Sequence, residues 1–111
     1  MKKLEIITRP EKLEILKQIL DEKTGGLNIV NIMGYGNQNG TVKGANGKEY
    51  QIGMLPKIKV ETIVSDDRYE QLIDELVAEL NTGNHGDGKI AVYDVVDYVR
   101  IRTGEHGDAA L

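Results

Sequence analysis

The sequence predicts an α+β fold in which a four-stranded antiparallel sheet carries two helices on one face. Four short segments have the alternating apolar pattern of strands. Two others repeat apolar residues at three- and four-residue steps, as amphipathic helices do. These segments follow one another as strand, helix, strand, strand, helix, strand, with a long glycine-rich stretch between the two middle strands.

The first half of the chain supplies a strand, a helix and a second strand. Residues 3–8 (KLEIIT) read as a short strand, and Pro10 can start a helix because its missing N–H is not needed there. The helix is expected over residues 11–22 and is ended by Thr-Gly-Gly at 24–26. Residues 27–33 alternate weakly and predict the second strand.

Residues 34–53 differ from the segments around them, because six of these residues are glycine and no apolar period is visible. A loop of this length in a small domain is usually functional or disordered, and we expect it to be mobile when free and to become ordered on a partner. The alternative is an extended hairpin with Asn46-Gly47 at its tip, since Asn-Gly favours a type I′ turn. The two interpretations are compatible.

The second half repeats the pattern of the first. Residues 57–64 alternate clearly and predict a strand, and Ser65-Asp66-Asp67 offers an N-cap and first-turn carboxylates for a helix over 69–80. Residues 89–95 predict a strand, 98–102 a second short extended piece and 103–111 a polar tail. This order is that of the ferredoxin-like plait, formed by one domain over residues 1–111. The fold does not fix the function.

Composition excludes several classes of function. A net charge of −4, with no Phe, no Trp and five Tyr, argues against nucleic acid as the main partner. The absence of Cys rules out disulfides and thiolate metal sites and fits a cytoplasmic location. No apolar run is long enough to span a membrane, so membrane association would require a partner protein.

The segment 82–89 (TGNHGDGK) is the strongest functional signal. Glycine-dense turns leave backbone N–H groups uncovered, which can bind an anion, and Lys89 adds a cation. Arg100 and Arg102 would share one face of a strand, so we expect three cations and a set of amides to converge on a polyphosphate. The plainer alternative is a helix-to-strand connection followed by a solvated edge. The segment lacks the Gly-x-x-x-x-Gly-Lys-Ser/Thr pattern of a P-loop.

An enzyme is not indicated, since no positioned nucleophile and no histidine–carboxylate pair can be identified in the sequence. Two histidines, His85 and His106, are expected to be exposed and unrelated to metal binding.

Taken in order, several short motifs resemble the PII signal-transduction (nitrogen regulatory) family over the whole chain. They are Arg9-Pro10, Gly34-Tyr35-Gly36 with Gln38, Glu49-Tyr50, Leu55-Pro56-Lys57, Thr82-Gly83 with Gly86-Asp87-Gly88-Lys89, Arg100-Ile101-Arg102-Thr103-Gly104-Glu105 and Asp108-Ala109-Ala110-Leu111.

The resemblance implies a homotrimer with ATP or ADP bound in the clefts between subunits. Residues 86–89 (the B-loop), with Arg100 and Arg102 of the neighbouring subunit, would hold the phosphates. The resemblance further assigns nucleotide contacts to Asn28, Glu61 and Ile63 and, at the base of the T-loop (residues 34–53), to Gly36, Asn37 and Gln38.

The resemblance also implies a second ligand, 2-oxoglutarate. Gln38 would complete the shell of a Mg²⁺ that bridges ATP and 2-oxoglutarate, which suits the preference of Mg²⁺ for oxygen ligands. Lys57 would pair with one carboxylate of 2-oxoglutarate and Arg9 would reach the other end. The plainer alternatives are a solvated edge lysine, a loop amide and a surface arginine.

The regulatory role implied by the resemblance is that of a non-catalytic sensor acting through the T-loop. The target would be an Amt-type ammonium transporter or an enzyme of nitrogen metabolism. Tyr50 matches a tyrosine that some bacteria uridylylate. The chain departs from the family at several positions, which puts the partner in question: Asn28, Met33, Asn37, Asn39 and Asn46, and a missing T-loop arginine unless Lys43 or Lys48 replaces it. Alternatives are a related adenylate sensor of carbon or bicarbonate handling, which Gln38 and Lys57 argue against, and a slow ATPase.

Overall fold

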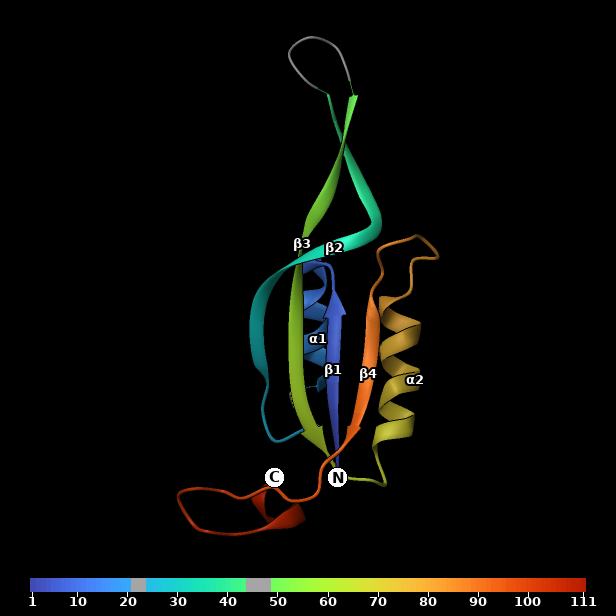
Figure 1. The fold of residues 1–111 in the computed structure, drawn as a ribbon. Coiled ribbons are helices and arrows are strands. Elements are labelled where there is room, and N and C mark those ends of the chain that lie inside the picture. The colour runs from blue at the N-terminus through green and yellow to red at the C-terminus, as the bar shows by residue number, and fades with distance from the viewer. Residues whose placement is uncertain (21–23, 44–48) are drawn as a thin grey trace.

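The computed structural model describes residues 1–20, 24–43 and 49–111, with the backbone alone for 36–43 and 49–52. Its sheet has the spatial order β2-β3-β1-β4, and every neighbouring pair is antiparallel. The strands are β1 (Lys2–Thr8), β2 (Asn28–Lys43), β3 (Glu49–Val64) and β4 (Lys89–Asp94). The helices α1 (Leu13–Leu20) and α2 (Tyr69–Leu80) lie side by side along the sheet (Figure 1). The predicted ferredoxin-like fold is confirmed.

The core lies between the sheet and the two helices. Successive residues of a strand point to opposite faces, so Leu4 and Ile6 of β1 and Val60 of β3 all point toward the helices. They meet Leu16 of α1 and Leu76 of α2, and all five side chains are at most 1% exposed. The opposite face of the sheet carries mainly charged and half-exposed residues, and no described helix covers it (Figure 1).

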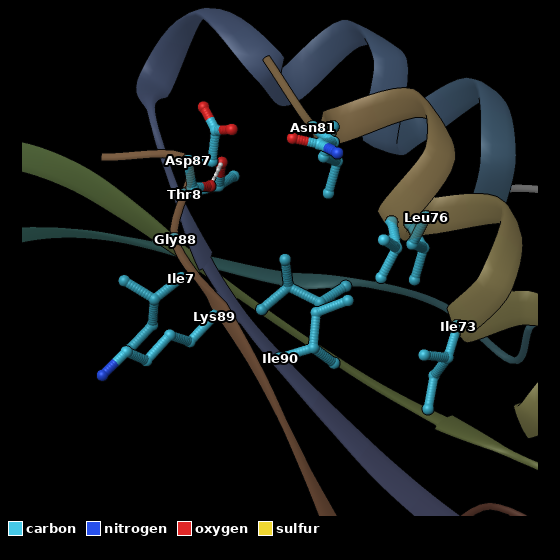
Figure 2. A pocket seen from close by; sticks show the side chains of 12 residues that line it. Ile7, Thr8, Ile73, Leu76, Asn81, Asp87, Gly88, Lys89 and Ile90 are labelled. Carbon is cyan, nitrogen blue, oxygen red and sulfur yellow. Dashed lines mark hydrogen bonds between the residues drawn. The ribbon is translucent and has the colours of Figure 1, made fainter. Parts of the chain in front are cut away.

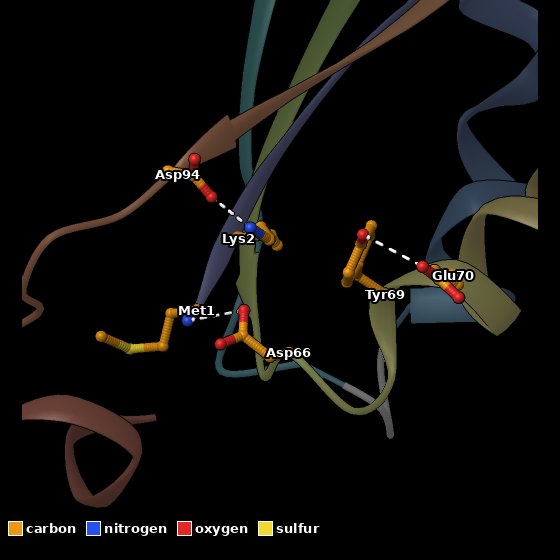
Figure 3. Close-up of polar contacts among 6 residues, drawn as sticks. All are labelled: Met1, Lys2, Asp66, Tyr69, Glu70 and Asp94. Carbon is orange, nitrogen blue, oxygen red and sulfur yellow. Dashed lines mark hydrogen bonds and ion pairs between the residues drawn. The ribbon is translucent and has the colours of Figure 1, made fainter.

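The helix ends differ in part from the sequence prediction. A 3-10 turn, η1 (Pro10–Lys12), precedes α1, and the Thr24 hydroxyl donates to the Leu20 carbonyl at 3.0 Å beyond its last turn. The predicted N-cap at Ser65 is wrong: Arg68 is the N-cap of α2, and no side chain caps that end. The carboxylate of Asp66 instead pairs with the N-terminal amine at 2.9 Å (Figure 3).

The glycine-rich stretch forms the hairpin that the sequence allowed as an alternative. β2 and β3 each have 16 residues, and together they project beyond the rest of the sheet (Figure 1). The pairing shifts between Tyr35 and Gly40, because Tyr35 pairs with Met54 whereas Gly40 pairs with Ile52. Residues 36–39 of β2 therefore lie opposite Gly53 alone, and we refer to this irregular stretch as the bulge. Like a β-bulge, an insertion of this kind bends a strand. The expected Asn46-Gly47 tip lies outside the described residues.

The C-terminal segment is not the second extended piece expected over residues 98–102. Val99 forms a single bridge with His106, and the chain turns at residues 101–103. The N–H of Gly104 donates to the Arg100 carbonyl at 2.8 Å, which closes this turn. The tail then forms a 3-10 helix, η2 (Gly107–Ala110), beyond the Asp94 end of β4 (Figure 1).

Candidate functional site

The loop that joins α2 to β4 lies at the upper end of the sheet in Figure 1. Its backbone requires glycine at residue 88, where φ is +104° and a Cβ atom would lie 1.8 Å from the carbonyl oxygen of Ile7. Residues 83 and 86 also have positive φ. The glycines singled out in the sequence therefore let this loop lie directly against the last residues of β1.

The carboxylate of Asp87 points into its own loop. Its Oδ2 accepts hydrogen bonds from the N–H of Thr82 at 2.7 Å and the N–H of Gly83 at 3.1 Å. Its Oδ1 accepts the Thr82 hydroxyl proton at 2.5 Å. The hydrogen bond from Thr82, which favours the charged form, lowers the pKa of Asp87. These contacts tie the two ends of the loop together.

Two cations converge on the carbonyl oxygen of Gly86. Lys57 Nζ donates to it at 2.9 Å and Arg9 Nε at 3.1 Å, and Arg9 also reaches the His85 carbonyl. Lys57 is only 7% exposed, and burial, followed by the nearby Arg9 guanidinium, lowers its pKa. The alternative of a solvated edge lysine is therefore wrong, whereas Arg9 is a half-buried arginine that contacts the loop.

The carbonyl groups of this loop are occupied, whereas several of its N–H groups are not. The Thr8 hydroxyl donates to the Asp87 carbonyl at 2.7 Å, next to the two cations on Gly86. Within the described residues, the N–H groups of Gly86, Asp87 and Gly88 donate none of the loop's hydrogen bonds. Backbone N–H groups of this kind can bind an anion.

The base of the hairpin lies next to Lys57. A Cβ atom on Gly34 would lie 3.3 Å from Lys57 Cγ, so the two strands pack closely there. The predicted ligand residues Gly36, Asn37 and Gln38 follow within the bulge. Their side chains lie outside the described residues, as does that of Tyr50, whose backbone pairs with Val42 farther along the hairpin.

A second group of predicted residues lies on the open face at the other end of the sheet. Asn28 pairs with Glu61 across β2 and β3, and Ile63 pairs with Lys3 across β3 and β1. The Glu61 carboxylate lies 3.6 Å from the ammonium groups of Lys3 and Lys59. At the usual rise of a strand, Glu61 lies about 13 Å from Lys57 along β3.

Arg100 and Arg102 lie still farther from the glycine loop, beyond the Asp94 end of β4 (Figure 1). The Arg100 guanidinium contacts the Glu105 carboxylate at 3.3 Å and the Leu111 carbonyl at 2.9 Å. Arg102 is exposed in the turn that follows. The prediction that both arginines meet Lys89 at one point is wrong within a single chain, because β4 separates them by its whole length.

A cleft of about 350 Å³ opens between α2 and the strands β1 and β4 (Figure 2). Leu76 and Ile90 are part of its apolar lining, whereas Thr8, Asn81 and Asp87 lie at its polar end. Sequence reasoning missed this cleft and also the contact of Thr8 with the loop. The sequence did offer one signal for the contact of Thr8 with the loop. Thr8 is a polar residue at the end of the first strand, on the side that faces the core.

The described residues contain no group of three acidic or histidine side chains placed to hold a metal ion. None of the helices in the described part of the chain is long and apolar enough to cross a membrane.

The comparison with known families is decisive. A family model described as nitrogen regulatory protein P-II matches residues 1–105. The chain belongs to this family. It is 40% identical over 112 aligned residues to nitrogen regulatory protein P-II of Klebsiella oxytoca, and each chain is covered over 100% of its length. The identity and coverage are the same for nitrogen regulatory protein P-II 1 of Escherichia coli K12.

Solved structures of this family have the same fold as the present chain. GlnK of B. subtilis has a TM-score of 0.79 and 37% identity, covering 99% of this chain and 97% of GlnK. The complex of B. subtilis GlnK with ATP has a TM-score of 0.78 and 34% identity, covering 99% of this chain and 96% of the other. The chain is thus similar both to nitrogen regulatory proteins and to a protein whose structure has been solved with ATP.

Proposed function

We propose that this chain is a non-catalytic nitrogen regulator that binds ATP or ADP between the subunits of a homotrimer. The observation that carries the proposal is the division of the predicted nucleotide residues between opposite ends of the sheet. The α2–β4 loop with Gly86, Gly88 and Lys89 precedes β4 at one end of the sheet, and the segment after Asp94, which carries Arg100 and Arg102, lies beyond the other end (Figure 1). No single chain can bring both groups to one triphosphate, but two chains packed head to tail can.

Other features of the chain support an assembly of subunits. Val96 and Ile101 in the C-terminal segment are 101% and 99% exposed, so two large apolar side chains there are available to a neighbouring subunit. Tyr93, on the open face of the sheet, is 47% exposed. The ATP complex of B. subtilis GlnK supports the choice of nucleotide.

The test uses variants from the two ends of the sheet. Arg102→Ala and Lys89→Ala each remove one cation, and we expect each to weaken ATP binding in titration calorimetry by about 10- to 100-fold. Arg68→Ala, which removes an exposed arginine at the start of α2, is the matched control and should bind as the parent does.

Mixing the two variants then tests whether one site draws on two chains. If the subunits are exchanged by unfolding and refolding the mixture, about one site in four regains both cations. Tight ATP sites that reappear in the mixture support a shared site. A mixture with no tight sites, made from variants that both assemble, would show that each site lies within one chain.

We propose 2-oxoglutarate as the second ligand, bound at Lys57 when Mg-ATP is present. The buried amine of Lys57 contacts the glycine loop, and its stem packs against Gly34, two residues before the bulge that contains Gln38. A cation at this place suits a carboxylate. Gln38 would supply one oxygen to a Mg²⁺ shared with ATP, and Arg9 would contact the distal carboxylate. Parent protein should bind 2-oxoglutarate only with Mg-ATP, and Gln38→Ala should keep ATP binding but lose 2-oxoglutarate. Retained 2-oxoglutarate binding by that variant would overturn the assignment.

The output of this sensor would be a target protein contacted by the hairpin. An Amt-type ammonium transporter or an enzyme of nitrogen metabolism fits the regulatory family and the projection of the β2–β3 hairpin away from the sheet (Figure 1). Binding of a purified target that depends on the nucleotide and on 2-oxoglutarate, with no turnover of ATP, would support this role. Steady release of phosphate from ATP at a rate that Lys89→Ala abolishes would indicate an enzyme instead.

A further inference from the structure

The side chain of Asp87 is the feature of the glycine loop that direct nucleotide binding does not explain. Its carboxylate accepts the N–H of Thr82, the N–H of Gly83 and the hydroxyl proton of Thr82. These donors belong to the start of the loop, whereas Asp87 is near its end. The carboxylate thus closes a ring of six residues, 82–87, from inside.

We call the hydrogen bonds from Thr82 and Gly83 to the Asp87 carboxylate the clamp. A clamp of this kind is needed because the loop is rich in glycine. Residues 83, 86 and 88 all have positive φ, and glycine leaves the backbone free to adopt many other conformations when nothing holds it. Most of the other contacts of the loop act on the carbonyl groups of His85, Gly86 and Asp87. Asn81 Oδ1 also accepts the N–H of Gly83 at 2.8 Å, and the Thr82 hydroxyl accepts the N–H of Asn84 at 3.3 Å. Asp87 is the side chain whose contacts join the start of the loop to its end.

The charge of Asp87 also argues against a direct contact with phosphate. A carboxylate beside a triphosphate is repulsive, unless a cation or several donors neutralise it. Here three donors already lie within 3.1 Å of its two oxygens. The Asp87 carboxylate is therefore satisfied by donors of its own loop, while the N–H groups of Gly86 and Gly88 stay available to an anion.

We propose that Asp87 and Thr82 are positioning residues that hold the glycine loop in its phosphate-binding shape, without contacting the nucleotide through their side chains. This inference rests on the proposed function, because ATP is taken as the ligand of the loop. It assigns a different role to Asp87 from that of the ligand residues Lys89, Arg100 and Arg102.

The two roles of Asp87 predict opposite signs in one experiment. Asp87→Asn removes the negative charge and replaces one of the two acceptor oxygens by an NH₂ group, so the hydrogen bonds that remain lose their charge assistance. A positioning role predicts ATP binding weakened by about 10- to 100-fold in calorimetry. If the carboxylate faced the triphosphate, the same change would remove repulsion, and ATP would bind equally well or more tightly. Asp74→Asn, on the exposed face of α2, makes the same change of charge and should leave ATP binding unaltered.

Thr82 provides a second test that keeps the charge of Asp87. Thr82→Val removes the hydroxyl donor and should weaken ATP binding by about 3- to 10-fold, whereas Thr82→Ser keeps the donor and should bind within about 2-fold of the parent. Equal affinities for the Val and Ser variants would overturn the proposal. This pair decides the question even if Asp87→Asn does not fold.

Amide exchange separates the inference from the proposed function, because it needs no nucleotide. In Asp87→Asn without ATP, the N–H group of Thr82 should exchange faster than in the parent, while core amides of β1 keep their protection. The N–H of Gly83 also donates to Asn81, so residue 82 is the one that reports on Asp87. Unchanged exchange at Thr82 would overturn the clamp. A parent protein that shows the clamp but binds no ATP would overturn the proposed function and leave the clamp standing.

Discussion

Substituting the glycine at residue 88 with alanine tests how the loop is seated on the sheet. At this position φ is +104°, and the added Cβ would lie 1.8 Å from the Ile7 carbonyl oxygen and 2.9 Å from Thr8 Cα. Both obstructing atoms belong to the backbone of β1, an inner strand paired on both sides. The clash therefore cannot be relieved by turning a side chain.

The magnitude follows from two contributions. The left-handed backbone disfavours alanine by roughly 1–2 kcal/mol. Relief of the clash also breaks the contact of the loop with the end of β1, including the Thr8–Asp87 hydrogen bond of 2.7 Å. Hydrogen bonds are worth about 1 kcal/mol each, so we expect a total loss of about 3–5 kcal/mol for Gly88→Ala. Gly83→Ala is the matched control, since φ there is +79° and nothing lies within 4 Å of the added Cβ.

The assay is urea unfolding followed by circular dichroism at one fixed protein concentration, because subunit association contributes to apparent stability. Gly83→Ala should lose roughly 1–2 kcal/mol, from the backbone term alone. Gly88→Ala should lose more, about 3–5 kcal/mol, and its thermal midpoint should fall by about 10–20 °C. Equal unfolding free energies for the two variants would refute the view that β1 confines this loop.

Three further predictions concern the core, a buried hydroxyl and acid stability. Leu76→Ala, at a position 0% exposed, should lower the unfolding free energy by about 2–5 kcal/mol in the same urea assay. Thr62→Val keeps the volume but removes the donor to the Gly26 carbonyl at 2.7 Å, and urea unfolding should show a loss of about 1 kcal/mol. Hydrogen bonds to Thr82 and His106 hold the pKa values of Asp87 and Asp97 below their ordinary value of 3.8. Their stabilisation is present above this value and is lost as the pH falls through the lowered folded pKa values, so the urea midpoint should drop below about pH 4 and drop less in Asp87→Asn.

The elements that bury a regular apolar pattern could be predicted from the sequence. Residues 57–64 alternate, and the inward-pointing members, such as Val60 and Val64, are 0% and 1% exposed. The helices followed from spacing in the same way. The hairpin remained one of two interpretations, because glycine-rich segments carry little pattern, and its strands are held by backbone pairing, which a sequence does not display.

The C-terminal segment shows where local pattern misleads. Residues 98–102 alternate as a strand would, but a strand also needs a partner for its backbone groups. Within the described residues, this segment has the single bridge between Val99 and His106, and it turns instead. The expected convergence of Arg100 and Arg102 with Lys89 was also wrong within one chain. Sequence order alone does not show which segments lie at the same end of a sheet.

The glycine loop was found from its sequence, but the roles of its side chains were not. A carboxylate among glycines can bind a ligand or hold the loop, and only the geometry of Asp87 with Thr82 and Gly83 favours the second role. Lys57 was ambiguous in the same way. Its alternation with Ile58 placed it on the open face of the strand, whereas the loop and the hairpin base bury it to 7% exposure.

The bulge in β2 gives the hairpin the geometry of a lever. Tyr35 is the last residue paired before the bulge, and Gly40 begins the paired stretch beyond it, so the outer ribbon joins the sheet through one irregular point. The described part of this arm, from Gly40 to Lys43, is about 10 Å long at the usual rise of a strand. A rotation of about 10° at the bulge would therefore move Lys43 by about 2 Å. A small change beside Lys57 would in this way be enlarged along the arm, away from the sheet.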